Sequence, residues 1–323
     1  MRRTKRWRRV LTDPMVYLAA SALVHTAGAL SASGRRRLAG VAGSLLWRSS
    51  PERRQVVLEN LAVAFPELSV RERCDLGRRS LRHTLLNALD FAHLLHSPAE
   101  VLRNVTLDTV TERIRVGAVG RPVMMVIPHL GSWELFGNAA SLHGVPVAAV
   151  AHEIRNPYLG RLVQRARTAH GLEIIPSVGA ARGIVRAVRS GRHIGLLMDQ
   201  NTRIREGGAY VDFFGLPVTV TRAPAVLARR LGMAVYAGAC VRRDDGFHIV
   251  TESLPLEVEA YANEQELLQA IMAANEALIR RFPEQYVWTY RRWRYVPPDL
   301  PEAQQRRYPS YARPGEAQRS DPA

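Results

Sequence analysis

The segment best suited to chemistry is residues 127–134, in which His129 ends an apolar run and Glu134 follows five positions later. A neutral imidazole can remove the proton of a hydroxyl as that oxygen attacks a thioester carbonyl. A carboxylate on the other ring nitrogen fixes the tautomer and stabilises the imidazolium. We therefore predict a His129–Glu134 pair with His129 as general base. The spacing alone also allows a half-buried histidine beside a glutamate that favours the helix dipole.

The neighbouring residues predict the elements that position this pair. Residues 123–127 are continuously apolar and follow Pro122, which is typical of a buried strand. Pro128 ends the strand, and Ser132 can cap a helix that begins after it. His129 is then expected at the carboxyl end of a strand, where open α/β sheets bind their ligands.

Strand and helix patterns alternate after this point, and they predict an α/β fold with a central, mostly parallel sheet flanked by helices. We expect strands at 147–151, 172–175 and 193–198, paired strands at 234–241 and 248–251, a loop or hairpin at 201–221, and helices at 157–171, 180–189, 222–231 and 264–282. The helical periodicity of residues 51–102 predicts an N-terminal helical layer. Asp199 then leaves its strand at the same edge of the sheet as His129.

Five ordered blocks of sequence carry a family resemblance. They are residues 60–69 with Glu72-Arg73, residues 129–134, Asn156-Pro157 with the arginines at 165 and 167 before Gly171, Asp199-Gln200 with residues 211–215, and residues 284–288 with residues 291–293. In this order they resemble the late acyltransferases of lipid A biosynthesis, within the wider HxxxxE/D group of lysophospholipid acyltransferases. The resemblance covers roughly residues 50–296.

The resemblance implies transfer of a fatty acyl chain from a thioester to a hydroxyl of a glycolipid at the cytoplasmic face of the bacterial inner membrane. The donor would be acyl carrier protein, or else acyl-coenzyme A. His129 carries over as the general base and Glu134 as its partner. Arg167 and Asp199 match polar positions of the family, and we expect them to shape the donor or acceptor site. Alternatively, Arg167 is a solvated helix arginine and Asp199 begins a turn.

Arginines lie beside aromatic residues near the end of the last block. Arg291 and Arg292 are suited to the phosphates of a lipid headgroup, because guanidinium groups bind phosphate through paired hydrogen bonds. Cation–π packing that closes the end of the domain is the alternative. Phe213 and Phe214 could line an acyl-chain tunnel or support a long loop.

The N-terminus predicts membrane attachment. Basic residues at 2–9 precede an apolar segment at 15–30, which is short for a comfortable span of about 20 residues. A cleaved signal peptide, a short span and an interfacial helix all fit, and we favour an uncleaved anchor. We therefore expect an anchor at 1–34, an acyltransferase domain at 35–298, with its helical layer at 51–105 and its α/β core at 106–298, and a disordered tail at 299–323.

The amino-acid composition indicates which classes of partner the protein can bind. The net charge of +16 is carried almost wholly by arginine, with Lys5 as the single lysine, and it favours phospholipid surfaces, lipid phosphates or an acidic carrier protein. No nucleic-acid-binding pattern occurs in the sequence. Cys74 and Cys240 lie far apart, so neither a metal site nor a cofactor is expected.

The sequence lacks a GxSxG motif, which favours direct attack by the acceptor over an acyl-enzyme. Backbone amides near Gly131 could stabilise the oxyanion. Other acceptors fit the same pattern: a phosphatidylinositol mannoside, an ornithine lipid or a lysophospholipid. A lipid-binding protein without catalysis is a further alternative.

Overall fold

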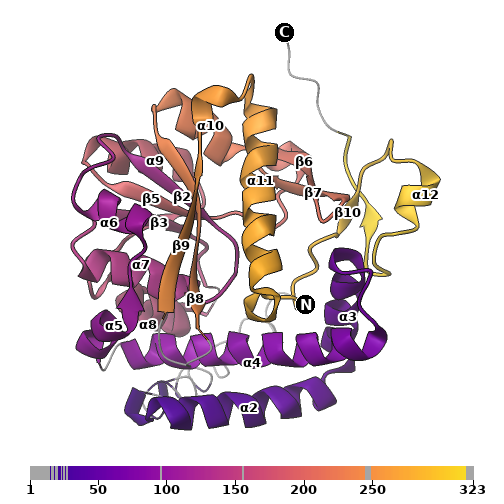
Figure 1. The fold of residues 1–323 in the computed structure, drawn as a ribbon, viewed down its shortest axis with the longest axis horizontal. Helices are drawn as coiled ribbons and strands as arrows, with labels where there is room; N and C mark the ends of the chain where they lie inside the picture. Colours follow the sequence, from indigo (N-terminus) through magenta and orange to yellow (C-terminus); the bar gives the residue numbers. More distant parts are fainter. Residues whose placement is uncertain are drawn as a thin grey trace, which may run out of the picture.

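A seven-stranded sheet organises the chain (Figure 1). The computed structural model describes residues 28–94, 97–154, 156–243 and 249–317, together with Met15, Leu18, Ser21, Ala22, Val24 and Thr26. The predicted basic cluster at 2–9 and much of the predicted anchor lie outside these residues. Among the described helices, none is long and apolar enough to cross a membrane.

The sheet has the order β1-β9-β8-β2-β5-β3-β4. Its strands are β1 (Val105–Thr106), β2 (Val123–Ile127), β3 (Val147–Ala151), β4 (Glu173–Pro176), β5 (His193–Leu197), β8 (Ala234–Arg242) and β9 (Ile249–Leu256). All neighbours are parallel except β8 and β9, which pair antiparallel. The predicted mostly parallel sheet flanked by helices is confirmed.

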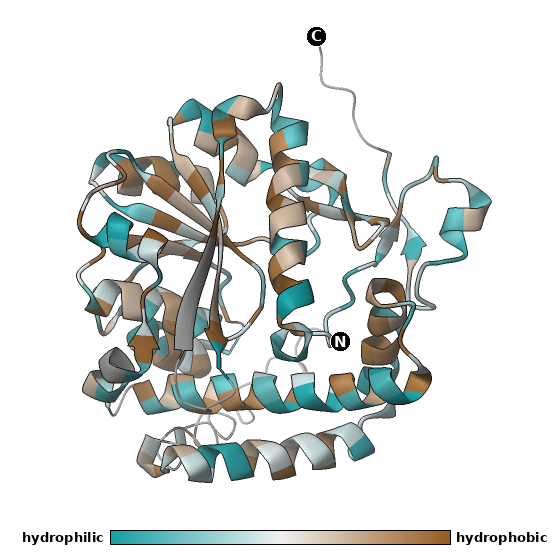
Figure 2. Ribbon diagram, in the orientation of Figure 1, coloured by the Kyte–Doolittle hydropathy of each residue, from teal (hydrophilic) through white to brown (hydrophobic). Residues whose placement is uncertain are grey.

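Helices cover both faces of this sheet. The helices α6 (Thr109–Arg115), α7 (Trp133–Leu142) and α8 (Pro157–Thr168) lie on one face, and α9 (Ala180–Arg189), α10 (Ala223–Arg230) and α11 (Glu264–Arg281) lie on the other. Strand alternation separates two cores, because Met125 and Ile127 face α7 whereas Met124 and Val126 face α11. Figure 2 shows hydrophobic residues concentrated on the strands between these layers.

The N-terminal helical layer comprises α2 (Ala32–Ser49), α3 (Pro51–Ala64), α4 (Val70–Leu94) and α5 (Pro98–Asn104). Helix α4 contacts the loops at the carboxyl ends of the central strands. The Ser80 hydroxyl donates to the Tyr286 carbonyl at 2.5 Å, and the Asn87 amide donates to the Gly131 carbonyl at 2.5 Å. The layer thus fixes the loop that follows β2.

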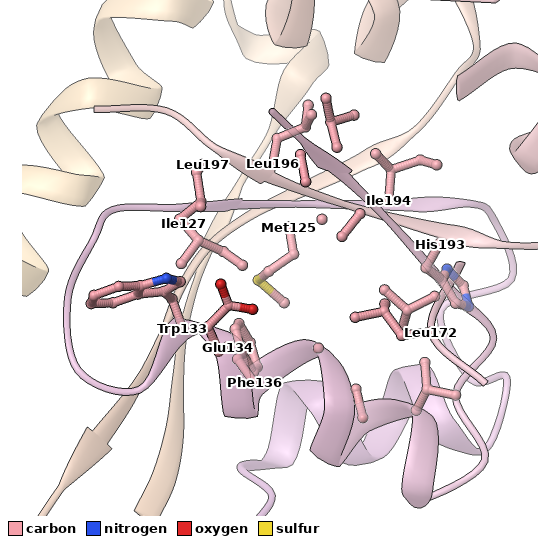
Figure 3. Close-up of a pocket in the computed structure, with 18 of the residues that line it drawn as sticks. Met125, Ile127, Trp133, Glu134, Phe136, Leu172, His193, Ile194, Leu196 and Leu197 are labelled. Carbon is pink, nitrogen blue, oxygen red and sulfur yellow. The ribbon is translucent and has the colours of Figure 1, made fainter. Parts of the chain in front are cut away.

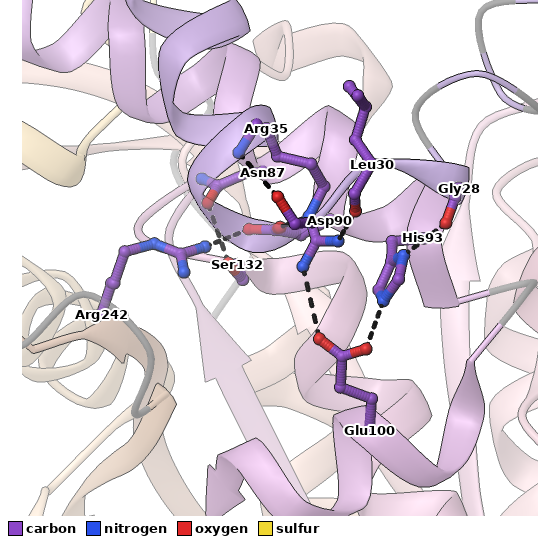
Figure 4. A network of polar contacts seen from close by, with 11 residues as sticks. Gly28, Leu30, Arg35, Asn87, Asp90, His93, Glu100, Ser132 and Arg242 are labelled. Carbon is purple, nitrogen blue, oxygen red and sulfur yellow. Dashed lines mark hydrogen bonds and ion pairs between the residues drawn. The ribbon is translucent and has the colours of Figure 1, made fainter.

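A buried polar network joins α2, α4 and β8 (Figure 4). The Asp90 carboxylate accepts from Arg35 Nε at 2.8 Å and also from the Arg242 guanidinium. His93 bonds the Gly28 carbonyl through Nδ1 and the Glu100 carboxylate through Nε2, each at 2.8 Å. The network satisfies charged groups that would be costly to bury alone.

The hairpin of β6 (Gly208–Phe213) and β7 (Leu216–Thr221) packs against α11. Phe213 and Phe214 at its turn are buried. Phe214 lies edge-on to Trp288, with 6.0 Å between ring centroids, and Phe213 stacks on Trp293. Both phenylalanines therefore support the loop and do not line the apolar cavity described below.

The disorder predicted for residues 299–323 is wrong for residues 302–317. This segment contains α12 (Glu302–Gln305) and β11 (Arg313–Pro314), which pairs with β10 (Tyr295–Val296). The Ser310 amide and the Tyr311 hydroxyl donate to Glu59 and Asn60 of α3. Side-chain contacts with the folded domain hold this polar segment, and residues 318–323 lie outside the described chain.

Single-turn 3₁₀ helices occur at Ile204–Glu206, Val258–Ala260 and Pro283–Gln285.

Candidate active site

His129 and Asp199 meet at the carboxyl ends of two neighbouring parallel strands, β2 and β5. The His129 ring bonds Asp199 through Nδ1, with 2.6 Å between Nδ1 and Oδ1. The His129 backbone amide donates to the other carboxylate oxygen at 2.9 Å. Two bonds to one carboxylate fix both the ring and its tautomer. Nε2 is then the nitrogen that can accept a proton.

Burial and charge oppose each other at this pair. Burial alone would lower the pKa of His129, but the charge and hydrogen bond of Asp199, with a smaller contribution from Glu134, raise it above the ordinary value. Burial would raise the pKa of Asp199, whereas His129 and then Arg292 hold it below its usual range. Asp199 is 3% exposed. It therefore stays ionised beside the imidazole.

Two buried side chains lie behind Asp199. Burial lowers the pKa of Arg292, which is 1% exposed and donates to the side-chain oxygen of Asn201 at 2.8 Å. Burial and the nearby Asp199 charge raise the pKa of Tyr286 well above its usual range. Arg292 thus supplies positive charge to the closed side of the site.

The predicted pairing of His129 with Glu134 is wrong, because Asp199 occupies the Nδ1 side of the ring. Glu134 lies in the first turn of α7 and forms a paired interaction with Arg167 of α8, at 2.9 Å from Nε to Oε2 and 2.5 Å from Nη2 to Oε1. The two side chains are 24% and 18% exposed. Closeness in sequence favoured Glu134, whereas strand order places Asp199 beside the ring.

The free side of His129 faces a partly open space. Its side chain is 18% exposed. The side-chain nitrogen of Gln200 lies 3.4 Å from Nε2, and the Trp133 ring stands edge-on with its centroid 5.2 Å away. A hydroxyl could approach Nε2 from this side.

The backbone amides of Gly131 and Ser132 are not available as the oxyanion donors that the sequence suggested near Gly131. The amide of Gly131 donates to the Gln285 carbonyl at 3.1 Å, and that of Ser132 donates to the Cys240 carbonyl at 2.7 Å. Gly131 has a φ of 60°, and a side chain there would overlap the Cys240 carbonyl. These two amides hold the loop against Gln285 and against β8, and they are already satisfied.

An apolar cavity of about 100 Å³ begins beside this site (Figure 3). Trp133, Glu134 and Arg167 line it near His129, and the cavity continues between α7 and the sheet face formed by β2, β5 and β3. Figure 3 shows His193 and Leu172 at the end away from Trp133 and Glu134. The His193 ring accepts the Val123 amide at 3.0 Å, and burial lowers the pKa of His193.

Arg291 and Arg292, which the sequence predicted to bind a lipid phosphate, differ in exposure. Arg292 is buried behind Asp199, so it cannot contact a lipid phosphate from this position. Arg291 is exposed, and its guanidinium lies 5.7 Å from the Tyr311 ring centroid. Within the described residues, no group of three or more histidine, cysteine, aspartate or glutamate side chains could hold a metal ion.

Comparisons with known proteins show what this chain resembles in sequence. A sequence model described as bacterial lipid A biosynthesis acyltransferase matches residues 3–295. The chain is 27% identical over 250 residues to the lipid A biosynthesis palmitoleoyltransferase of Escherichia coli K12, covering 76% of this chain and 80% of that protein. It is 24% identical to the lauroyltransferase of the same strain, covering 80% and 85%. It is also 27% identical over 132 residues to a phosphatidylinositol mannoside acyltransferase of Mycolicibacterium smegmatis, covering 40% and 43%.

Proposed function

Because the chain belongs to the family of bacterial lipid A biosynthesis acyltransferases, and is therefore an acyltransferase, we propose that it transfers a fatty acyl chain from a thioester to a hydroxyl of a lipid A precursor. The observation that carries the mechanism is the His129–Asp199 pair beside Trp133, which lines one end of the apolar cavity. The cavity takes the acyl chain, and its mouth holds the thioester carbonyl near His129.

The reaction proceeds by direct attack. The acceptor hydroxyl attacks the thioester carbonyl carbon while His129 Nε2 takes its proton. Asp199 stabilises the imidazolium that forms. The tetrahedral intermediate then expels the thiolate, the carbon–sulfur bond breaks, and His129 returns the proton to sulfur. The products are an ester and a free thiol.

The donor and acceptor approach from the open side of the site. Acyl carrier protein is the proposed donor, with acyl-coenzyme A as the alternative, since the net charge of +16 favours anionic partners. Arg167 and Glu134 lie where the cavity opens, and they orient the thioester or the acceptor hydroxyl. Arg291 is exposed and remains a proposed contact for a lipid phosphate.

We further propose that the protein works at the cytoplasmic side of the inner membrane. One face of α2 carries the exposed apolar side chains of Val41 and Leu45. These two side chains line a shallow groove, which is also lined by Arg37, Arg48 and Arg82. Apolar side chains flanked by arginines suit an interface with anionic lipids.

The test is mass spectrometry of lipids from a strain that lacks this gene, complemented with wild type or with His129→Ala. We expect one acyl chain of lipid A to be restored by wild type only, and the purified variant to lose at least about 100-fold in rate. A missing chain on a phosphatidylinositol mannoside or another lipid would keep the mechanism and change the acceptor. Restoration by His129→Ala would refute the catalytic proposal and favour a lipid-binding role.

A further inference from the structure

Gly195 lies in the middle of β5, one of the central strands, and faces the apolar cavity. In the parallel register it pairs with Met125 of β2 on one side and with Ala149 of β3 on the other. These three residues form one row across the cavity face of the sheet. Gly195 leaves this row without a side chain at its centre.

Neither backbone conformation nor close packing requires a glycine here. Gly195 is not among the glycines with positive φ. A Cβ atom at Gly195 would meet only the Ala149 Cβ atom, at an ordinary 3.8 Å. Gly238 on β8 differs, because a Cβ atom there would overlap the Met125 sulfur. Glycine weakens a strand interior and often marks the close approach of a ligand.

The strand register gives the depth of this row in the cavity. Ile127 and Leu197 form the row nearest His129. Gly195 lies one row deeper, and two residues along a strand span roughly 6.6 Å. The next row contains Val123 and His193, at the far end. A side chain at position 195 would therefore divide the cavity midway along its length.

We infer that Gly195 is the residue that lets long acyl chains enter, and so determines which chain length the enzyme transfers. This inference rests on the proposed function, because it assigns the cavity to the acyl chain. A methionine at position 195 would fill the space that the distal methylenes occupy. A chain short enough to end before this row would still fit.

The test is a competition assay with purified enzyme, a lipid A precursor and an equimolar set of saturated acyl carrier protein thioesters of increasing length. Gly195→Met is expected to lower the rate for the longest chain used by wild type, relative to the shortest, by at least about tenfold. One methylene in an apolar pocket is worth roughly 10- to 200-fold in discrimination. Gly195→Ala should move the ratio in the same direction by less.

Met124→Leu is the matched control, because Met124 lies on the neighbouring strand but faces the opposite core. The substitution also conserves side-chain volume. Its length profile should equal that of wild type. An active Gly195→Met or Gly195→Ala enzyme with an unchanged profile would overturn the inference. If Gly195→Met does not fold, the graded shift in Gly195→Ala decides. Failure of wild type to transfer any chain would instead refute the proposed function.

Discussion

The two carboxylates of the site occupy opposite environments. Asp199 is enclosed, bonds His129 twice and has the buried Arg292 behind it. Glu134 is part of a paired interaction with Arg167 at the accessible mouth of the cavity. In the proposed mechanism, the closed pair, His129–Asp199, controls the protonation of the base, whereas the open pair, Glu134–Arg167, contacts the substrates. Burial thus separates two acidic residues that the sequence alone does not distinguish.

The largest effect should come from Asp199→Asn. The asparagine amide can donate to Nδ1, which leaves the proton on Nε2 and removes the base. We expect kcat to fall roughly 1000-fold, or about 4 kcal/mol in activation free energy, with little change in KM. Steady-state kinetics with Asp199→Glu as a companion variant tests this. A loss no larger than that of Glu134→Gln would erase the distinction between the two carboxylates.

The pH profile gives a second measure of the closed pair. The raised pKa of His129 means that kcat/KM should fall as pH drops through a value above about 6.5. The pair stabilises the fold most fully between about pH 4 and pH 6.5, the ordinary pKa values of its two members. This contribution is lost as pH rises through the folded pKa of His129 and as pH falls through the lowered pKa of Asp199. In the residual activity of Asp199→Asn, the midpoint should move to lower pH because burial then dominates. An unmoved midpoint would mean that another group is titrating.

Removing the positive charge behind Asp199 should mainly lower the stability of the fold. Arg292→Met leaves the carboxylate without its buried cationic neighbour, and we expect a loss of about 3 kcal/mol in the free energy of unfolding. Urea unfolding measures it, with the exposed Arg291→Met as the matched control. Equal stability of the two variants would show that Arg292 does not compensate the buried charge.

The open pair should give the smallest effect on the chemical step. Glu134→Gln keeps one acceptor for Arg167 but removes the charge, so we expect about a tenfold loss in kcat/KM, mainly through KM. Kinetics at varied donor and acceptor concentrations identify which substrate is affected. A loss confined to kcat would place Glu134 with the base and contradict the division proposed here.

Much of the scaffold could be predicted, because apolar runs such as residues 123–127 and 193–198 identify buried parallel strands. The same logic placed His129 and Asp199 at one edge of the sheet. Their contact was missed because sequence spacing does not reveal which strands are neighbours. Glu134 is near in the chain, but its position in α7 directs it toward Arg167.

Composition was a weaker guide where tertiary contacts decide. Arg292 was expected at a lipid headgroup, yet it is buried, and its guanidinium lies 5.3 Å from the Phe213 ring centroid, which agrees with the cation–π alternative. The polar C-terminal segment predicted disorder, although Tyr308 and Tyr311 were the available signal for packing. Their hydroxyls donate to the Pro217 carbonyl and to Asn60.

The buried network around Asp90 makes the N-terminal helix α2 part of the catalytic scaffold. Arg35 of α2 and Arg242 at the end of β8 share one carboxylate, and α4 carries both Asp90 and Asn87, which bonds the loop after His129. The chain can therefore be shortened from its N-terminus only as far as these contacts are kept. Removal of residues upstream of Gly28 spares these contacts. Removal through Arg35 leaves the buried Asp90 with only one of its two arginine partners, Arg242, and should yield an enzyme that is hard to fold.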